Sequence, residues 1–411
     1  MIAAAASPLA QCAQTPDGVL FAVFQNGSKA NGGVESITQI IEGLGAVPRL
    51  VLTNAETHIT ARWRGASVET KVWPLPYGLG QSWRAGGVIP LARRLVSLLA
   101  TNWWTWRVLR DRNIRAVHCN DPAPFWHVAL GARLAGVPLL LNLRDTKSRE
   151  EGLDIGKYRR RFRFCERVLV LSREMKEFYE QACTVRHGKS HPFIEYIYSA
   201  VDSERMRPLG FSERRSLRQK LGIEEEAFAV GFIATFNDKK NQLDYLREAV
   251  PLLRGHCPAA KTFFVGDFEP QTNRYAASCT HIVHDLGLKD CVRFVGFCSQ
   301  IEKWYQACDV VVVPTRKEGL ARCMIEAMAC GTPVVSFDVA SAREILEEHH
   351  CGRVVPQGDY EQLCVTLTEL AKSPELRKDY ATNGVALAHR LFSSRTCANN
   401  YQNLILSLQK A

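Results

Sequence analysis

The segment from Val310 to Phe337 constrains the fold more than any other part of the chain. It begins with four consecutive valines and ends with a second apolar run that starts at Val334. Such runs, apolar on both faces, are typical of strands buried in a parallel sheet. Between them we expect a helix from Glu318 to Ala329, which the following glycine and proline would stop. The segment therefore predicts a strand–helix–strand unit of an α/β fold.

A helix that begins at Glu318 would bring charged and polar groups to the carboxyl edge of the sheet, where ligands bind in such folds. The open amides of Gly319, Leu320 and Ala321 would form an anion site beside this carboxylate. Glu326 follows Glu318 at a spacing of about 80° around a helix, so the two carboxylates would lie on neighbouring faces. A core helix whose glutamates are only solvated would show the same pair.

Strand and helix patterns alternate along the chain, and its 411 residues suffice for two domains. About seven apolar runs come first, and the pattern restarts at Ala229 after a polar stretch that contains proline and glycine. We place the interdomain linker in that stretch, Ser203 to Ser216. The alternation predicts two doubly wound, Rossmann-like α/β domains that face a cleft, residues 1–205 and 206–394.

The composition excludes several classes of protein. A chain that is 46% hydrophobic and 23% charged is ordinary for a globular protein. No run approaches the ~18–20 apolar residues of a membrane-spanning helix. The 14 cysteines include no CxxC pair, which favours free thiols in a reducing cytosol over zinc or disulfides. The net charge of +10 indicates an anionic partner, but no nucleic-acid-binding module accompanies it, so we expect no nucleic acid.

The residues around Glu318 and Glu326 resemble the signature of the retaining glycosyltransferases of family 4, which have the GT-B fold. The match consists of the two glutamates, the seven residues between them and the sequence AMACGTPVV. In that family the first glutamate contacts the hydroxyls of the donor sugar, and the second holds the ribose of the nucleotide. The resemblance implies these roles here. It also implies a C-terminal helix, residues 395–411, that packs back on the first domain.

The resemblance extends to loops of the second domain. Lys240 aligns with the family's phosphate-binding lysine, and Lys239 is a close contender. Gly266 and Phe297 match strand-end turns that border the nucleotide base in relatives, although ordinary turns have the same residues. Thr235 stands where the family usually has an arginine, so one cationic phosphate contact is missing or supplied elsewhere.

In the first domain the resemblance is weaker. Gly32 and Gly33 resemble the loop that covers the donor diphosphate in the family, although a flexible turn explains these glycines equally well. Many relatives place a histidine near the reacting sugar where this chain has Arg144. Arg144 and Asp145 are candidates for the catalytic cleft, and a structural ion pair explains them as well.

The resemblance implies a retaining, metal-independent hexosyltransferase that uses a nucleotide-diphosphate sugar. The expected catalytic residues are Glu318, Lys240, Arg144 and Asp145. The expected donor-binding residues are Glu326, Gly32, Gly33, Lys239, Gly319, Leu320, Ala321, Gly266 and Phe297. No Asp-X-Asp motif occurs, so we expect neither a metal nor another cofactor. The alternative is a non-catalytic GT-B subunit that binds nucleotide or glycan. It would explain the departures at Thr235, at Arg144 and at Ala321, where relatives often have glycine.

The charge and tryptophan content of one segment of the first domain also predict attachment to a membrane. Between Arg62 and Arg115 there are ten basic and two acidic residues, and six of the eight tryptophans. On a helix from 90 to 110, the core side is expected to contain Leu91, Leu95, Leu98, Trp106 and Leu109. Trp104 would lie on the outward face with Arg93 and Arg107, which suits an anionic lipid surface. Packing of the tryptophans under a neighbouring loop is the alternative. We therefore expect a cytoplasmic protein, peripheral on the inner face of the cell membrane, with a lipid-linked or cell-surface glycan precursor as acceptor.

Overall fold

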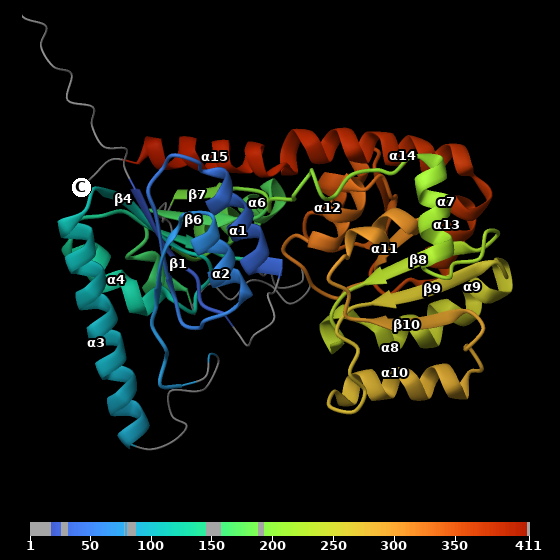
Figure 1. Cartoon of the computed structure of the whole chain (residues 1–411), viewed down its shortest axis with the longest axis horizontal. Coiled ribbons are helices and arrows are strands. Elements are labelled where there is room, and N and C mark those ends of the chain that lie inside the picture. Colours follow the sequence, from blue (N-terminus) through green and yellow to red (C-terminus); the bar gives the residue numbers. More distant parts are fainter. Residues whose placement is uncertain are drawn as a thin grey trace, which may run out of the picture.

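The computed structural model describes residues 18–25, 32–77, 79, 88–144, 158–187 and 193–408. Its described strands form two parallel sheets, each in its own lobe of the molecule (Figure 1). Helices alternate with the strands in both lobes, which confirms the expected pair of doubly wound α/β domains. Among the described residues, no helix combines the length and the apolar character that crossing a membrane requires.

The first sheet has seven strands in the order β3-β2-β1-β4-β5-β6-β7. The strands are β1 (Gly18–Ala22), β2 (Arg49–Thr53), β3 (Glu69–Val72), β4 (Ile114–Cys119), β5 (Leu139–Asn142), β6 (Arg167–Val170) and β7 (Phe193–Tyr196). The helices are α1 (Gly32–Gly43), α2 (His58–Gly65), α3 (Val88–Asp111), α4 (Phe125–Leu134), α5 (Arg159–Phe162) and α6 (Arg173–His187). The strand order reverses between β1 and β4, which creates a switch point at the carboxyl edge.

The second sheet repeats this topology with six strands in the order β10-β9-β8-β11-β12-β13. The strands are β8 (Phe228–Ile233), β9 (Ala260–Val265), β10 (Val292–Gly296), β11 (Val310–Val313), β12 (Val334–Phe337) and β13 (Gly352–Val355). The longer helices are α7 (Phe211–Lys220), α10 (Arg274–Asp285), α12 (Arg322–Ala329), α13 (Tyr360–Lys372) and α14 (Pro374–Leu387). The four valines of β11 are fully buried, as the sequence predicts. The switch point lies between β8 and β11.

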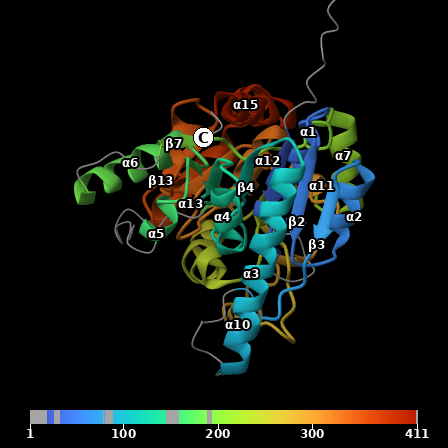
Figure 2. The same cartoon turned by 90° about the vertical axis from the view of Figure 1, so that its left-hand side faces the viewer.

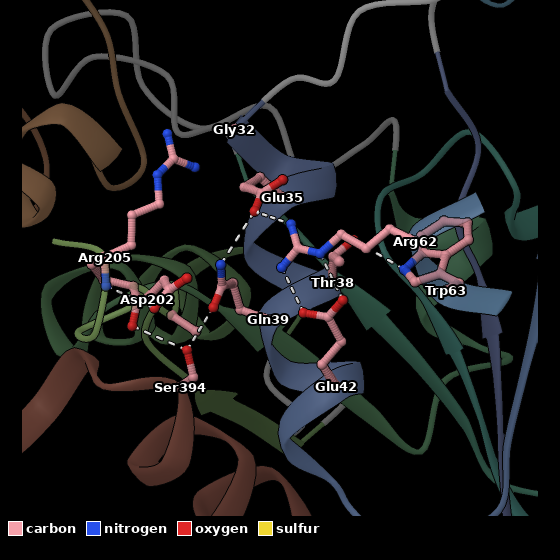
Figure 3. Close-up of polar contacts among 12 residues, drawn as sticks. Gly32, Glu35, Thr38, Gln39, Glu42, Arg62, Trp63, Asp202, Arg205 and Ser394 are labelled. Carbon is pink, nitrogen blue, oxygen red and sulfur yellow. Dashed lines mark hydrogen bonds and ion pairs between the residues drawn. The ribbon is translucent and has the colours of Figure 1, made fainter. Parts of the chain in front are cut away.

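The chain passes between the lobes at two places that pair with each other. The amide of Val201 donates to the carbonyl of Phe392 at 2.7 Å, and the amide of Ser394 donates to the carbonyl of Val201 at 3.1 Å. Helix α15 (Ser394–Ser407) then lies along α1, and the hydroxyl of Ser394 donates to Gln39 at 2.6 Å (Figure 3). Helix α7 begins inside the stretch, Ser203 to Ser216, in which the sequence places the interdomain linker. The domain boundaries at residues 205 and 394 stay predictions.

Helix α3 lies at the end of the first lobe farthest from the second lobe (Figures 1 and 2), and it exposes a different face from the one expected. Trp104 is half-buried against the core, whereas Trp103 is 56% exposed. Leu91 and Leu95, expected in the core, are exposed, while Leu98 is half-buried and Leu109 is buried.

This correction has a local cause, because polar residues of α3 also face α4. The side chain of Asn102 donates to the Trp126 carbonyl at 2.8 Å and accepts from the Gly131 amide at 2.9 Å. A Cβ atom at Gly131 would lie 2.5 Å from the backbone oxygen of Asn102, so only glycine allows this approach. Hydrophobic periodicity therefore indicated the wrong face.

Candidate active site

Lys240 and Glu318 meet at the switch point of the second sheet. Lys240 follows β8 and Glu318 follows β11, and these strands are neighbours. Asn237 caps the short turn after β8, because its side-chain oxygen accepts from the Lys240 amide at 3.2 Å. The Lys240 ammonium group forms an ion pair with the Glu318 carboxylate, and their side chains are only 25% and 14% exposed. Lys239 is exposed. The geometry therefore favours Lys240 over Lys239 as the lysine that faces Glu318 at this edge of the sheet.

Helix α12 begins at Arg322 and not at Glu318, which corrects the expectation that the two glutamates share one helix. The residues from Glu318 to Ala321, which we name the donor loop, precede the helix. A Cβ atom at Gly319 would lie 2.1 Å from the backbone oxygen of Arg144, so this glycine permits close contact with the first domain. The amides of the donor loop thus lead into the helix start instead of forming its first turn.

Glu326 lies one turn into α12 and is held by two partners. Its Oε1 atom accepts from Nε of Arg322 at 3.0 Å, and its Oε2 atom accepts from the Tyr305 hydroxyl at 2.8 Å. Burial alone would lower the pKa of Arg322, but the charge of Glu326 outweighs it and raises that pKa, so the guanidinium group stays charged. We did not anticipate Arg322 from the sequence, although its position four residues before Glu326 is the spacing of a helical ion pair.

Arg322 also joins the second domain to the start of α1. Its Nη1 atom donates a hydrogen bond to the carbonyl oxygen of Gly32 at 3.3 Å. A Cβ atom at Gly32 would lie 2.8 Å from Cδ of Arg322, so a side chain at this position would force Arg322 to shift. Figure 3 shows Gly32 at the first turn of α1, above Glu35. Gly32 and Gly33 therefore belong to a helix, and their expected role in covering a diphosphate stays a prediction.

Arg144 follows β5 and reaches the last part of the first domain. Its Nη2 atom donates to the Ser199 hydroxyl at 3.2 Å. Asp145 lies outside the described residues. The charge of Arg144 also acts on His118. Burial, and to a lesser extent this charge, lower the pKa of His118 to about 3, so His118 is neutral at pH 7. Of the expected pair, only Arg144 is thus located, at the side of the first domain that faces the donor loop.

Gly266 and Phe297 follow β9 and β10, at the same edge of the second sheet as Lys240. A Cβ atom at Gly266 would lie 2.0 Å from the Ala234 backbone oxygen, and Phe297 is 69% exposed. Thr235 is also exposed and accepts from the Asn237 side chain at 3.0 Å. Within the described ranges, no group of three or more His, Cys, Asp or Glu side chains could hold a metal ion.

Comparison with known proteins identifies the class to which this fold and site belong. The family model described as glycosyl transferases group 1 matches residues 213–386, and the model described as glycosyltransferase family 4 matches residues 56–205. The chain is similar to the structure of HepE from Anabaena in complex with UDP, with a TM-score of 0.77 and 21% sequence identity. The match covers 95% of this chain and 100% of the HepE chain. The chain has the GT-B fold. It belongs to the glycosyltransferases of family 4.

Two curated relatives show how far the similarity extends along the sequence. EpsD of Bacillus subtilis is 31% identical over 196 residues, which are 48% of this chain and 50% of EpsD. The chain thus spans about half the length of the first curated relatives that it matches. The GDP-mannose-dependent monoacylated α-(1-6)-phosphatidylinositol monomannoside mannosyltransferase of Corynebacterium glutamicum is 26% identical over 315 residues, 73% of this chain and 78% of that relative.

Proposed function

We propose that the chain transfers a sugar from a nucleotide-diphosphate sugar to an acceptor hydroxyl with retention of the anomeric configuration. The observation that carries this proposal is the meeting of Lys240 and Glu318 beside the start of α12, at the switch point of the second sheet. HepE, which shares the fold, is described in complex with UDP and with UDP-glucose, which supports a nucleotide donor. In this proposal Glu318 contacts the donor sugar, Lys240 the diphosphate and Glu326 the ribose.

The chemistry requires stabilisation of a leaving diphosphate. The bond between the anomeric carbon and the diphosphate oxygen breaks, the acceptor oxygen forms the new bond, and the acceptor proton leaves with the diphosphate. The sugar passes through an oxocarbenium-like state while negative charge builds up on the diphosphate. The Lys240 ammonium group and the amides at the start of α12 stabilise that charge without reorganisation. The ion pair with Glu318 holds Lys240 in place before the donor binds.

A panel of nucleotide sugars, assayed by mass spectrometry, tests this function. We expect turnover of at least one donor, a product with the donor's anomeric configuration by NMR, and the same rate in EDTA, since the sequence lacks Asp-X-Asp. An inverted product contradicts retention. Loss of activity in EDTA that magnesium or manganese restores contradicts metal independence. Nucleotide binding without turnover of any donor would favour the non-catalytic GT-B subunit instead.

The acceptor in this proposal is lipid-linked, and α3 attaches the first domain to the inner face of the cell membrane. Leu95, Val96, Leu99 and Trp103 are exposed, and at 3.6 residues per turn they fall within about 100° of one another, so they share one face of α3. Arg93, Arg107 and Arg110 are exposed on the same helix, and the Arg107 guanidinium lies 5.8 Å from the Trp103 ring. Apolar side chains flanked by arginines suit the headgroup region of an anionic bilayer. The Corynebacterium glutamicum relative, whose name specifies a phosphatidylinositol mannoside, supports a lipid acceptor.

Co-sedimentation with liposomes tests the role of α3. We expect binding to anionic liposomes that falls with salt, and a loss of about fivefold in affinity for each arginine removed, since one basic residue contributes about 1 kcal/mol at such a surface. Trp103→Ala and Arg107→Ala should both weaken binding. Phe211→Ala, which removes an aromatic ring that is 87% exposed on the second domain, is the control and should bind like the wild type. Equal binding to neutral liposomes, or none to anionic ones, contradicts this attachment.

A further inference from the structure

The donor loop is anchored on its inner side by Ser341, which lies after β12. The Ser341 hydroxyl donates a hydrogen bond to the Gly319 carbonyl, and it shares its single proton with the Ala340 carbonyl at 2.5 Å. Ser341 is fully buried and has φ of 67°, a left-handed conformation that is unfavourable for a residue with a Cβ atom. A strained, buried serine of this kind persists only when its surroundings hold it in place.

Anchoring the Gly319 carbonyl also sets the direction of an amide. The peptide bond between Gly319 and Leu320 is planar and trans, so its C=O and N–H groups point in opposite directions. The hydrogen bond from Ser341 therefore turns the Leu320 amide away from Ser341. The Leu320 amide is one of the three from which the sequence predicts an anion site, and under the proposed function it faces the donor diphosphate.

The support for Ser341 comes from the other domain. The amide of Ser341 donates to Oε2 of Glu174 at 2.8 Å, and Glu174 lies in the first turn of α6, in the first domain. The contact is reciprocal, because Glu344 of the second domain accepts from the amides of Arg173 at 3.2 Å and Glu174 at 2.8 Å. Glu344 is 4% exposed and also accepts from the Tyr198 hydroxyl. Each domain thus supplies a carboxylate that binds backbone amides of the other domain.

We propose that Glu174 and Ser341 are positioning residues for sugar transfer. Through the chain of contacts from Glu174 to Ser341 to Gly319, the first domain sets the direction of the Leu320 amide in the second domain. The donor diphosphate then binds tightly when the two domains are in contact. This inference rests on the proposed function for its consequence, but the contacts themselves are independent of it.

Hydrogen–deuterium exchange of the nucleotide-free protein, together with titration of UDP and GDP, tests the inference. In Glu174→Ala and Ser341→Gly we expect about two- to tenfold faster exchange of residues 318–324, because one hydrogen bond is lost in each. The affinity for the nucleotide that the wild type binds should fall by a similar factor. Exchange of strand β9, which is remote from these contacts, should not change.

Two further variants separate positioning from a general loss of stability. Glu174→Gln keeps a side-chain oxygen that can accept from the Ser341 amide. Its exchange rate for residues 318–324 and its nucleotide affinity should therefore be close to those of the wild type. Glu177→Ala removes an exposed glutamate three residues along the same helix and should behave like the wild type. Unchanged exchange of residues 318–324 in both Glu174→Ala and Ser341→Gly overturns the inference. If the wild type binds none of the nucleotides of the donor panel, the proposed function fails. The exchange rates of residues 318–324 still test whether Glu174 and Ser341 position the loop.

Discussion

Replacing Asp309 with alanine is expected to lower the free energy of unfolding of the second domain by about 3–5 kcal/mol, because removing one partner of a buried ion pair leaves the other charge uncompensated. Asp309 lies just before β11 and pairs with Arg214 at 2.7 Å and with Arg218 at 3.0 Å. It also accepts from the Ala229 amide at 2.8 Å, which joins it to β8. The side chains of Asp309 and Arg218 are only 12% and 9% exposed, so solvent does not screen their interaction.

Urea denaturation of the wild type and the variant measures this effect. The matched control is Asp290→Ala, which removes an exposed carboxylate 3.1 Å from Arg254 and should cost less than about 1 kcal/mol. If the free energy of unfolding of Asp309→Ala also falls by less than about 1 kcal/mol, the ion pair contributes little to stability.

The same site predicts a dependence on pH. Burial alone would raise the pKa of Asp309, but Arg214 and Arg218 outweigh it and hold the pKa below its ordinary value of 3.8. Because the folded-state pKa is lowered, the stabilisation is fully present above the unfolded-state pKa of about 3.9 and is lost as the pH falls through the folded-state pKa. The difference in stability between the wild type and Asp309→Asn should therefore be largest near pH 7 and shrink below about pH 4.

Substitution of Lys240 or Glu326 is expected to lower the affinity for the donor nucleotide by about ten- to hundredfold. One charge-assisted hydrogen bond contributes about 1.5–3 kcal/mol, which corresponds to that factor. For Glu326 the informative change is to glutamine and not to alanine. Alanine would leave the buried Arg322 without its carboxylate and would lower stability as well. Glutamine keeps an oxygen for Arg322 or Tyr305 and removes only the charge.

Isothermal titration calorimetry with UDP and GDP measures these affinities. Lys239→Ala distinguishes the two neighbouring lysines, and it should bind nearly like the wild type because Lys239 is exposed and Lys240 faces Glu318. Lys303→Ala, which removes a half-buried lysine on another helix, is the control. Unchanged affinity in both Lys240→Ala and Glu326→Gln would remove these residues from the donor site.

The strands of both sheets could be predicted from the sequence because their signal is local. Val310 to Val313 is apolar at every position, and a strand with that pattern is stable only when both of its faces are buried. The position of Lys240 and Glu318 at one edge follows from the same pattern, since parallel strands present their carboxyl ends together. Their direct contact also depends on β8 and β11 being neighbours, which the alternation of elements does not specify by itself.

Other features depended on which segments pack together. Helix α12 starts at Arg322 and not at Glu318. The donor loop before it lies close to Arg144 of the first domain and is held by the Ser341 hydroxyl. Trp103 rather than Trp104 faces outward, because α4 packs on the polar side of α3.

The sequence by itself determined two doubly wound domains and the residues at the edge of the second sheet. Local periodicity and strand ends carry that information, because each depends on only a few consecutive residues. Only the tertiary structure decided that Arg322 reaches the Gly32 carbonyl and that Glu174 supports Ser341 across the domain boundary. These contacts join residues of both domains, and side chains find such partners only after the two sheets have been brought together.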